Sequence, residues 1–392
     1  MNYKTILDYK TNLFKILFVL YCNISLLFTW TEYQNLFTFL ISGYYLVQIV
    51  IIPILVIMFW ISSPNISEIV CFILCVGVGI LVALKIRDPR YLMFILFFFG
   101  SKDIDYISVF KCNVKFNIFI FLVTIFSSIV HIIPDITLER DAGVYRQSLG
   151  FSAPNLLILF FMIIVLQVII IKRNNLKITT ILIIFILTIL FGKLTDGRGG
   201  LIGILFTLLS ALLINKIKIE HLNTFFHKRL IKVFFVLLPE ILSLVMLILI
   251  IKVPYDSNLY NLLNKLFSFR FDISHFYFFN LGIHLLPEKP SIIYNYPWSS
   301  VFQVAIAPTI DNLYMFLFCF IGIVGMIVYL SIYSFLINNA IRNGDYWLLS
   351  CLIAFLLVGF VESQMVSPFV GIFAISFSNS NRLKMKNFRI NN

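Results

Sequence analysis

Residues 176–215 read LKITTILIIFILTILFGKLTDGRGGLIGILFTLLSALLIN, and this stretch decides the fold class. It contains two apolar runs, at roughly 176–194 and 201–215, each close to the ~20 residues that an α-helix needs to cross a bilayer. Between them lies a short polar connection, TDGRGG at 195–200. The stretch is therefore typical of two membrane helices joined by a tight turn.

The rest of the chain repeats this pattern. Of its 392 residues, 60% are hydrophobic and only 12% are charged, whereas an ordinary soluble domain has about 25% charged residues. The alternation expected of a transmembrane β-barrel is absent. We therefore predict an all-α, polytopic membrane protein that forms a single membrane domain over 1–392, with about 12 spans (10–12). The expected segments are 12–30, 36–60, 66–84, 90–101, 116–134, 153–171, 177–195, 199–215, 231–251, 311–337, 346–361 and 365–379.

The net charge of +12 indicates orientation, because most Lys and Arg residues lie in short loops. Cytoplasmic loops carry this excess, so nucleic acid is not the expected partner. The C-terminus is then cytoplasmic. The outer side carries 135–152, 195–198, 252–310 and 362–364. One basic loop, at 85–90, falls on the outer side and disagrees with the rule.

The loop 252–310 is the large extracytoplasmic loop. From Asn258 onward its leucines recur at i, i+3, i+4 and i+7, which predicts an amphipathic helix. Asp256 or Ser257 is the expected N-cap. Such a helix would lie on the outer leaflet.

Arg198 lies among glycines at an expected helix start. Glycine lets backbone approach a ligand, N-terminal N–H groups point outward, and guanidinium binds phosphate bidentately. We therefore predict an anion site with Arg198 as a catalytic residue and Gly199 and Gly200 in contact with substrate. The alternative is an arginine that only anchors the helix at the interface.

Arg140 and Arg146 lie on the same outer side, where basic residues are sparse. Their position favours binding of an anionic, lipid-linked substrate. The alternative is a pair of exposed loop arginines that contact Glu139 and Asp141.

A helix is expected to start directly after these arginines. Ser152 is the predicted N-cap and Pro154 fits the first turn. Asn155 then lies near the positive end of the helix and joins the predicted binding residues.

Four further residues are candidates for chemistry. Arg270 follows the amphipathic helix, where it is either a second charge-stabilising arginine or an interfacial anchor. The candidate bases on the outer side are His275 first and then Glu362, although a lone histidine is more often a polar surface residue. Glu240, in the middle of an apolar segment, is a functional candidate or a protonated carboxyl that joins helices. We find no P-loop, dinucleotide fingerprint or metal-ligand spacing.

Taken together, these stretches resemble Wzy-type polysaccharide polymerases. The run RQSLGFSAPN at 146–155 is similar to their Arg…Ser-Leu-Gly-Phe-x-x-Pro-Asn signature. DGRGG at 196–200 resembles the Ser-Arg-Gly-Gly element that they share with O-antigen ligases, with Asp196 in place of the usual serine. LLNKLFSFR at 262–270 resembles the arginine-bearing stretch of their large outer loop, and Asp311-Asn312 and Glu362-Ser363 follow in the usual order.

The resemblance implies a GT-C-like membrane glycosyltransferase that uses no metal, nucleotide or other cofactor. Its substrates would be undecaprenyl-diphosphate-linked oligosaccharide repeat units at the outer face of the bacterial cytoplasmic membrane, polymerised into capsule, O-antigen or exopolysaccharide. The growing chain would pass to a sugar hydroxyl of an incoming unit, with Arg198 and Arg270 on the leaving diphosphate. The implied partners are membrane lipid, a chain-length regulator and a flippase. The alternatives are an O-antigen ligase and a repeat-unit flippase or transporter.

Overall fold

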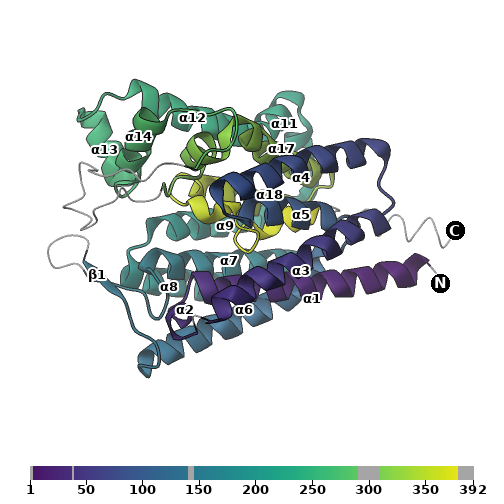
Figure 1. Ribbon diagram of the computed structural model, residues 1–392, viewed down its shortest axis with the longest axis horizontal. Helices are drawn as coiled ribbons and strands as arrows, with labels where there is room; N and C mark the ends of the chain where they lie inside the picture. Colours follow the sequence, from purple (N-terminus) through teal and green to yellow (C-terminus); the bar gives the residue numbers. More distant parts are fainter. Residues whose placement is uncertain (1–2, 38, 140–144, 290–309, 378–392) are drawn as a thin grey trace.

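The computed structural model describes residues 3–37, 39–139, 145–289 and 310–377. Most of its helices run side by side along the longest axis (Figure 1). The all-α expectation is thus confirmed, since the strands β1 (Thr137–Glu139) and β2 (Tyr145–Gln147) form only a small antiparallel hairpin.

Within the described residues, eight helices are long and apolar enough to cross a membrane. A ninth is obtained if α11 (Arg229–Val236) and α12 (Leu238–Lys252), which are bent by 60° at their junction, form one span. The eight are α1 (Tyr3–Thr29), α3 (Phe39–Ile61), α4 (Ile66–Ile86), α6 (Tyr106–Ile129), α7 (Pro154–Lys172), α8 (Ile178–Thr195), α9 (Arg198–Lys216) and the span Leu313–Arg342, which contains α16 (Leu313–Phe316), η2 (Leu317–Ile321) and α17 (Gly322–Arg342).

Two shorter apolar helices are enclosed by the others. In α5 (Arg90–Gly100) every residue after the first is buried, and α18 (Tyr346–Val358) is similarly covered. The segment expected at 365–379 is not one α-helix. As far as Phe377 it forms the short 3-10 turns η3 (Ser363–Val366) and η4 (Ile372–Ser376).

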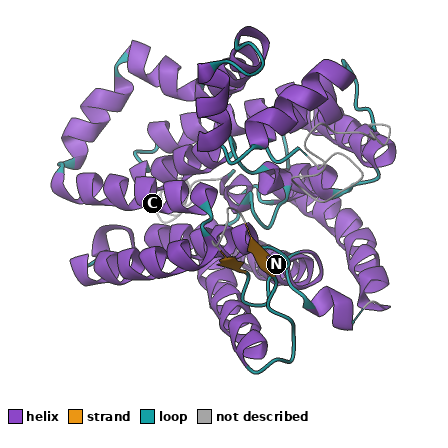
Figure 2. Ribbon diagram, turned by 90° about the vertical axis from the view of Figure 1, so that its left-hand side faces the viewer, coloured by secondary structure: helices purple, strands orange, loops and turns teal. Residues whose placement is uncertain are grey.

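The two ends of the bundle differ. One end carries β1, β2, α13 (Asn258–Leu266) and α14 (Arg270–Leu281), and we call it the loop face. Figure 2 views the molecule from this end and shows the hairpin among the helices. The opposite end, the basal face, carries the start of α1. The described parts of the loops expected on one side of the membrane therefore lie at one end.

Close helix packing at the loop face depends on the glycines of α9. A Cβ added to Gly200 would lie 2.8 Å from the Ile158 carbonyl oxygen, and one added to Gly203 would lie 2.3 Å from Met162 Sδ. Small residues let membrane helices approach closely. Hence α9 packs directly on α7, the most enclosed of the long helices.

The amphipathic helix expected from Asn258 is confirmed as α13. Ser257 is its N-cap and accepts a hydrogen bond from the Tyr260 backbone N–H at 3.2 Å. Leu259, Leu262 and Leu266 of its stripe are about half exposed, whereas Leu263 packs against the core and Asn264 is buried. One edge of the apolar stripe thus faces away from the protein, as in a helix that lies on a membrane surface.

The start of α7 differs by one residue from the expectation. Its N-cap is Ala153 rather than Ser152. Ser152 precedes the helix, and its backbone N–H donates to the Trp30 carbonyl oxygen at 2.9 Å. Pro154 is the first helical residue, as predicted, where its missing N–H costs no hydrogen bond.

Candidate active site at the loop face

Arg270 is the centre of a charged cluster at the loop face. Its Nη2 lies 3.2 Å from Glu362 Oε1 and its Nε lies 3.4 Å from Asp311 Oδ2. The side chains of Arg270 and Glu362 are only 16% and 4% exposed, whereas that of Asp311 is 37% exposed. One guanidinium thus holds two carboxylates from distant parts of the chain.

The turn between α13 and α14 positions Arg270. Ser268 and Phe269 both have positive φ, at 55° and 67°, which reverses the chain within a few residues. Asn264 stabilises this turn, because its carbonyl oxygen accepts from Phe269 N–H and its side chain accepts from Asp272 N–H. Arg270 consequently begins α14 beside the turn that carries Glu362.

Glu362 lies between the ends of several helices. Asn155, at the start of α7, has its Nδ2 within 3.4 Å of Glu362 Oε1. A Cβ added to Gly199, at the start of α9, would lie 3.3 Å from Glu362 Cγ. Burial raises the pKa of Glu362 from 4.5 to about 7, while Arg270 limits the rise. The carboxyl is therefore able to gain or lose a proton near neutral pH.

Asp311 was not among the predicted site residues. The sequence shows it beside Asn312 before an apolar segment, where capping is a sufficient explanation. Asn312 does cap α16, since its side chain accepts from Met315 N–H at 2.9 Å. Asn312 also donates to the Phe360 carbonyl oxygen at 2.7 Å, which ties this helix start to the Glu362 turn and brings Asp311 to Arg270.

Arg198 makes a contact close to this cluster. It is the first residue of α9, and its Nη1 donates to the Lys265 carbonyl oxygen at 2.6 Å. It therefore fastens α13 to the helix bundle. Gly199 and Gly200 are buried against protein atoms and permit close packing, and their contact with substrate stays a prediction.

Of the two arginines predicted in this hairpin region, only Arg146 lies within the described residues. Arg146 is half-buried on β2, opposite Leu138, and Arg140 lies outside the described residues. Asp135 accepts hydrogen bonds from the backbone N–H groups of Ser148 and Leu149, at 3.0 and 2.8 Å. The Ser-Leu-Gly-Phe run is thus a turn that leads the chain from the hairpin to Asn155.

His275 lies apart from this cluster. Its ring packs against Tyr255, Tyr260 and Phe279, with centroids 5.8, 5.4 and 4.5 Å away. Five residues of helix turn it by about 140° from Arg270. Burial lowers its pKa, against the opposing effect of Asp272, and the ring is held in an aromatic environment.

The basic loop at 85–90 reaches the same region. Arg90 pairs with Asp88 at 2.6 Å and donates to Gln364 Oε1 at 2.6 Å, two residues beyond Glu362. The loop at 85–90 therefore lies at the same end of the bundle as Glu362, where Asp88 compensates the charge of Arg90.

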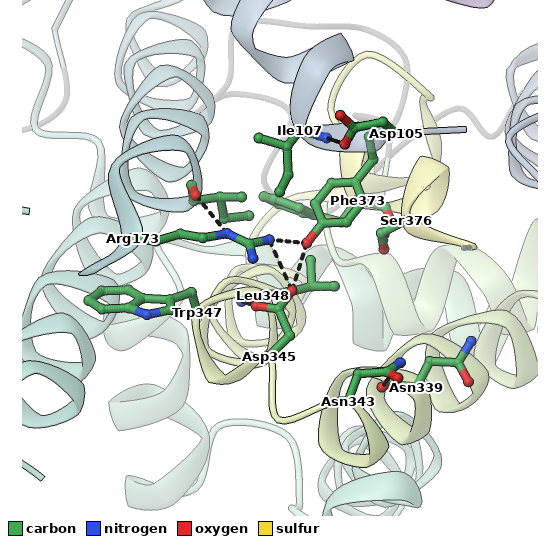
Figure 3. A network of polar contacts seen from close by, with 12 residues as sticks. Asp105, Ile107, Arg173, Asn339, Asn343, Asp345, Trp347, Leu348, Phe373 and Ser376 are labelled. Carbon is green, nitrogen blue, oxygen red and sulfur yellow. Dashed lines mark hydrogen bonds and ion pairs between the residues drawn. The ribbon is translucent and has the colours of Figure 1, made fainter. Parts of the chain in front are cut away.

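Two other contacts of charged groups hold helices together. Glu240 accepts a hydrogen bond from Ser334 at 2.8 Å, joining α12 to α17, as the helix-joining interpretation expects. At the basal face, Arg173 Nη2 lies 3.0 Å from Asp345 Oδ2, and Asp345 also accepts from the Tyr106 hydroxyl at 2.7 Å (Figure 3).

Searched over the described part of the chain, no three His, Cys, Asp or Glu side chains come together as a metal site. No protein-family model, curated protein or solved structure matches the chain.

Proposed function

We propose that this protein is a membrane glycosyltransferase that polymerises undecaprenyl-diphosphate-linked repeat units at the outer face of the bacterial cytoplasmic membrane. The observation that carries this proposal is the buried carboxyl of Glu362, with a pKa of about 7, held against Arg270 at the loop face. A general base with a pKa near the working pH is the most effective kind. A neighbouring cation suits a reaction that releases an anion.

The proposal includes the topology. The loop face would be the outer face, because the loops with the largest excess of Lys and Arg lie elsewhere. The nine spans of the described residues, the shorter helices α5 and α18, and the 3-10 turns after Glu362 would together make about twelve crossings. The last three would be partial crossings, and the arrangement would be GT-C-like. The exposed leucines of α13 would rest in the outer leaflet, where a lipid-linked substrate presents its diphosphate.

In the proposed reaction, the hydroxyl oxygen of the incoming unit forms a bond with the anomeric carbon of the growing chain. The bond from that carbon to the diphosphate oxygen breaks, and undecaprenyl diphosphate leaves with the electron pair. Glu362 takes the hydroxyl proton. Because the leaving group is already activated, no nucleotide is required.

The arginines and Asn155 would have separate roles in this reaction. Arg198, at the start of α9, would neutralise the departing diphosphate through its guanidinium. Arg270 would keep Glu362 and Asp311 oriented and strengthen the charge stabilisation as the glycosidic bond breaks. Asn155 would hold the Glu362 carboxyl through its amide. Arg146 would contact the second lipid diphosphate or the acceptor.

The test uses a host from which the chain has been deleted, complemented with wild type, Glu362→Gln or Arg270→Lys. Arg342→Gln, an exposed change at the end of α17, is the matched control. We expect Glu362→Gln to lower polymerisation about 10²–10⁴-fold, the usual contribution of a general base. Lysine cannot bridge two carboxylates as arginine does, so the Arg270→Lys variant should also polymerise poorly.

The surface glycan and the lipid-linked intermediates distinguish the alternatives. A polymerase defect leaves single repeat units at the outer surface without a long-chain ladder. Repeat units retained on the cytoplasmic leaflet would indicate a flippase, and long lipid-linked chains that are never transferred would indicate a ligase. Normal ladders with both site variants would overturn the assignment of Glu362 and Arg270.

A further inference from the structure

We propose that the basal face binds one anionic phospholipid, with an acyl chain in an apolar cavity and the head group in an adjoining polar cavity. The proposal concerns the opposite end of the bundle from the candidate active site, and it holds whether or not the protein is a glycosyltransferase.

The apolar cavity lies between the end of α9, α10 (Ile219–His227), α11 and α18. Its volume is about 510 Å³, within the range of small-molecule sites. Phe206, Leu213, Phe226 and Phe235 are among its walls, and Ser210 is one of its few polar lining residues. Such a lining suits a hydrocarbon chain and offers little to a polar ligand.

The polar cavity adjoins it and has a volume of about 450 Å³. Ile214, Ile217 and Tyr346 line both cavities, so the two share walls. The polar cavity also contains Arg173 and Lys218. An amphiphile with one apolar and one polar end matches this pair of cavities.

The charge of the polar cavity favours an anionic head group. Arg173 is paired with Asp345, as Figure 3 shows, so that pair is close to neutral. Lys218, exposed at the start of α10, then leaves one net positive charge at the cavity. Lys216 and Lys228 are also exposed nearby in the sequence. A phosphodiester with a neutral alcohol group carries the complementary single negative charge.

The helix α11, which forms one wall of the apolar cavity, has the character of an interfacial helix. Its Leu230 is 84% exposed and its Phe234 is 52% exposed, and Leu230 directly follows the exposed Arg229. This mixture of exposed apolar and basic side chains is typical of a helix in the membrane interface. The 60° bend between α11 and α12 fits a chain that turns from that interface into the bilayer. A lipid from the surrounding leaflet therefore has direct access.

The test is native mass spectrometry of the full-length protein in detergent, titrated with phosphatidylglycerol or phosphatidylethanolamine of identical acyl chains. Two variants separate the cavities. Lys218→Gln removes one charge, and Ser210→Trp fills the apolar cavity. Their matched controls are Lys111→Gln, exposed on α6, and Leu209→Trp, which is 60% exposed and lines neither cavity.

Wild type should bind one phosphatidylglycerol at least several-fold more tightly than phosphatidylethanolamine. Lys218→Gln should weaken phosphatidylglycerol about fivefold, the effect of one basic residue near a membrane surface, and Ser210→Trp should weaken both lipids. The two controls should bind as wild type does. Equal affinity of wild type for both lipids would overturn the anionic selectivity. Undiminished binding by a folded Ser210→Trp would overturn the acyl-chain assignment, and unchanged selectivity in the exposed Lys218→Gln variant would overturn the head-group assignment.

Discussion

Replacing Arg270 with alanine should destabilise the loop face in a pH-dependent manner. The guanidinium contacts Glu362 and Asp311 at 3.2 and 3.4 Å. Breaking an enclosed ion pair from one side costs about 3–5 kcal/mol, because the remaining charge stays buried. Asp311 is 37% exposed and is partly stabilised by solvent, so most of the cost falls on the 4% exposed Glu362.

Protonation of Glu362 would remove its charge and with it much of this free-energy cost. Its pKa is about 7 in the folded protein, above its ordinary value of 4.5. The folded state therefore favours the protonated form. The corresponding stabilisation is complete below pH 4.5 and is lost as pH rises to about 7, after which wild type shows no further change from this group.

Without Arg270 the pKa of Glu362 should rise further, because the interaction that lowers it is gone. The variant should then keep losing stability above pH 7, by up to about tenfold in the unfolding equilibrium constant per pH unit. Unfolding in mixed micelles between pH 6 and 8.5 measures this difference. The Glu362→Gln background should abolish it, and a destabilisation that is the same at every pH would refute the reasoning.

Three other outcomes follow from the packing and the charges. Gly200→Val should destabilise the protein by about 1–3 kcal/mol in thermal unfolding, because its side chain meets an α7 carbonyl oxygen 2.8 Å away; a neutral result would mean that α9 can shift. Arg198→Gln should lose the 2.6 Å hydrogen bond to Lys265 and lower the hydrogen-exchange protection of α13, with the core of α7 unaffected as the control. Asp345→Asn should cost about 2–3 kcal/mol, less than a fully enclosed pair, because Arg173 is 25% exposed; an unchanged unfolding midpoint would contradict this.

Patterns among neighbouring residues of the sequence predicted the local structure well. The length of the apolar runs indicated the membrane helices, because backbone hydrogen bonding and bilayer thickness leave few other choices. The leucine spacing after Asn258 and the hydroxyl of Ser257 predicted α13 and its cap, both of which involve residues only a few positions apart. The length of the apolar run at 365–379 did not predict its structure correctly, because an apolar run that is buried in protein is free to form 3-10 turns.

The structure brings some of the predicted site residues together and separates others, for one physical reason. Arg270, Glu362 and Asn155 do come together, although 92 residues separate the first two. Sequence alone could not show that Asp311 joins them, since a helix cap explains its position equally well. Nor could it show that His275 faces an aromatic cluster, because that depends on the rotation of α14 after the turn at Phe269.

The sequence by itself determined that this chain is a polytopic helical membrane protein with a large loop and an amphipathic helix, because hydrophobic length and periodicity are properties of consecutive residues. Only the tertiary structure decided which charges meet. Arg270 pairs with Glu362 and Asp311 because three separate helix starts and turns converge at the loop face. Gly199 and Gly200 allow close packing because α7 and the Glu362 turn lie directly against α9. Such contacts depend on how helices pack in three dimensions, which no local pattern encodes.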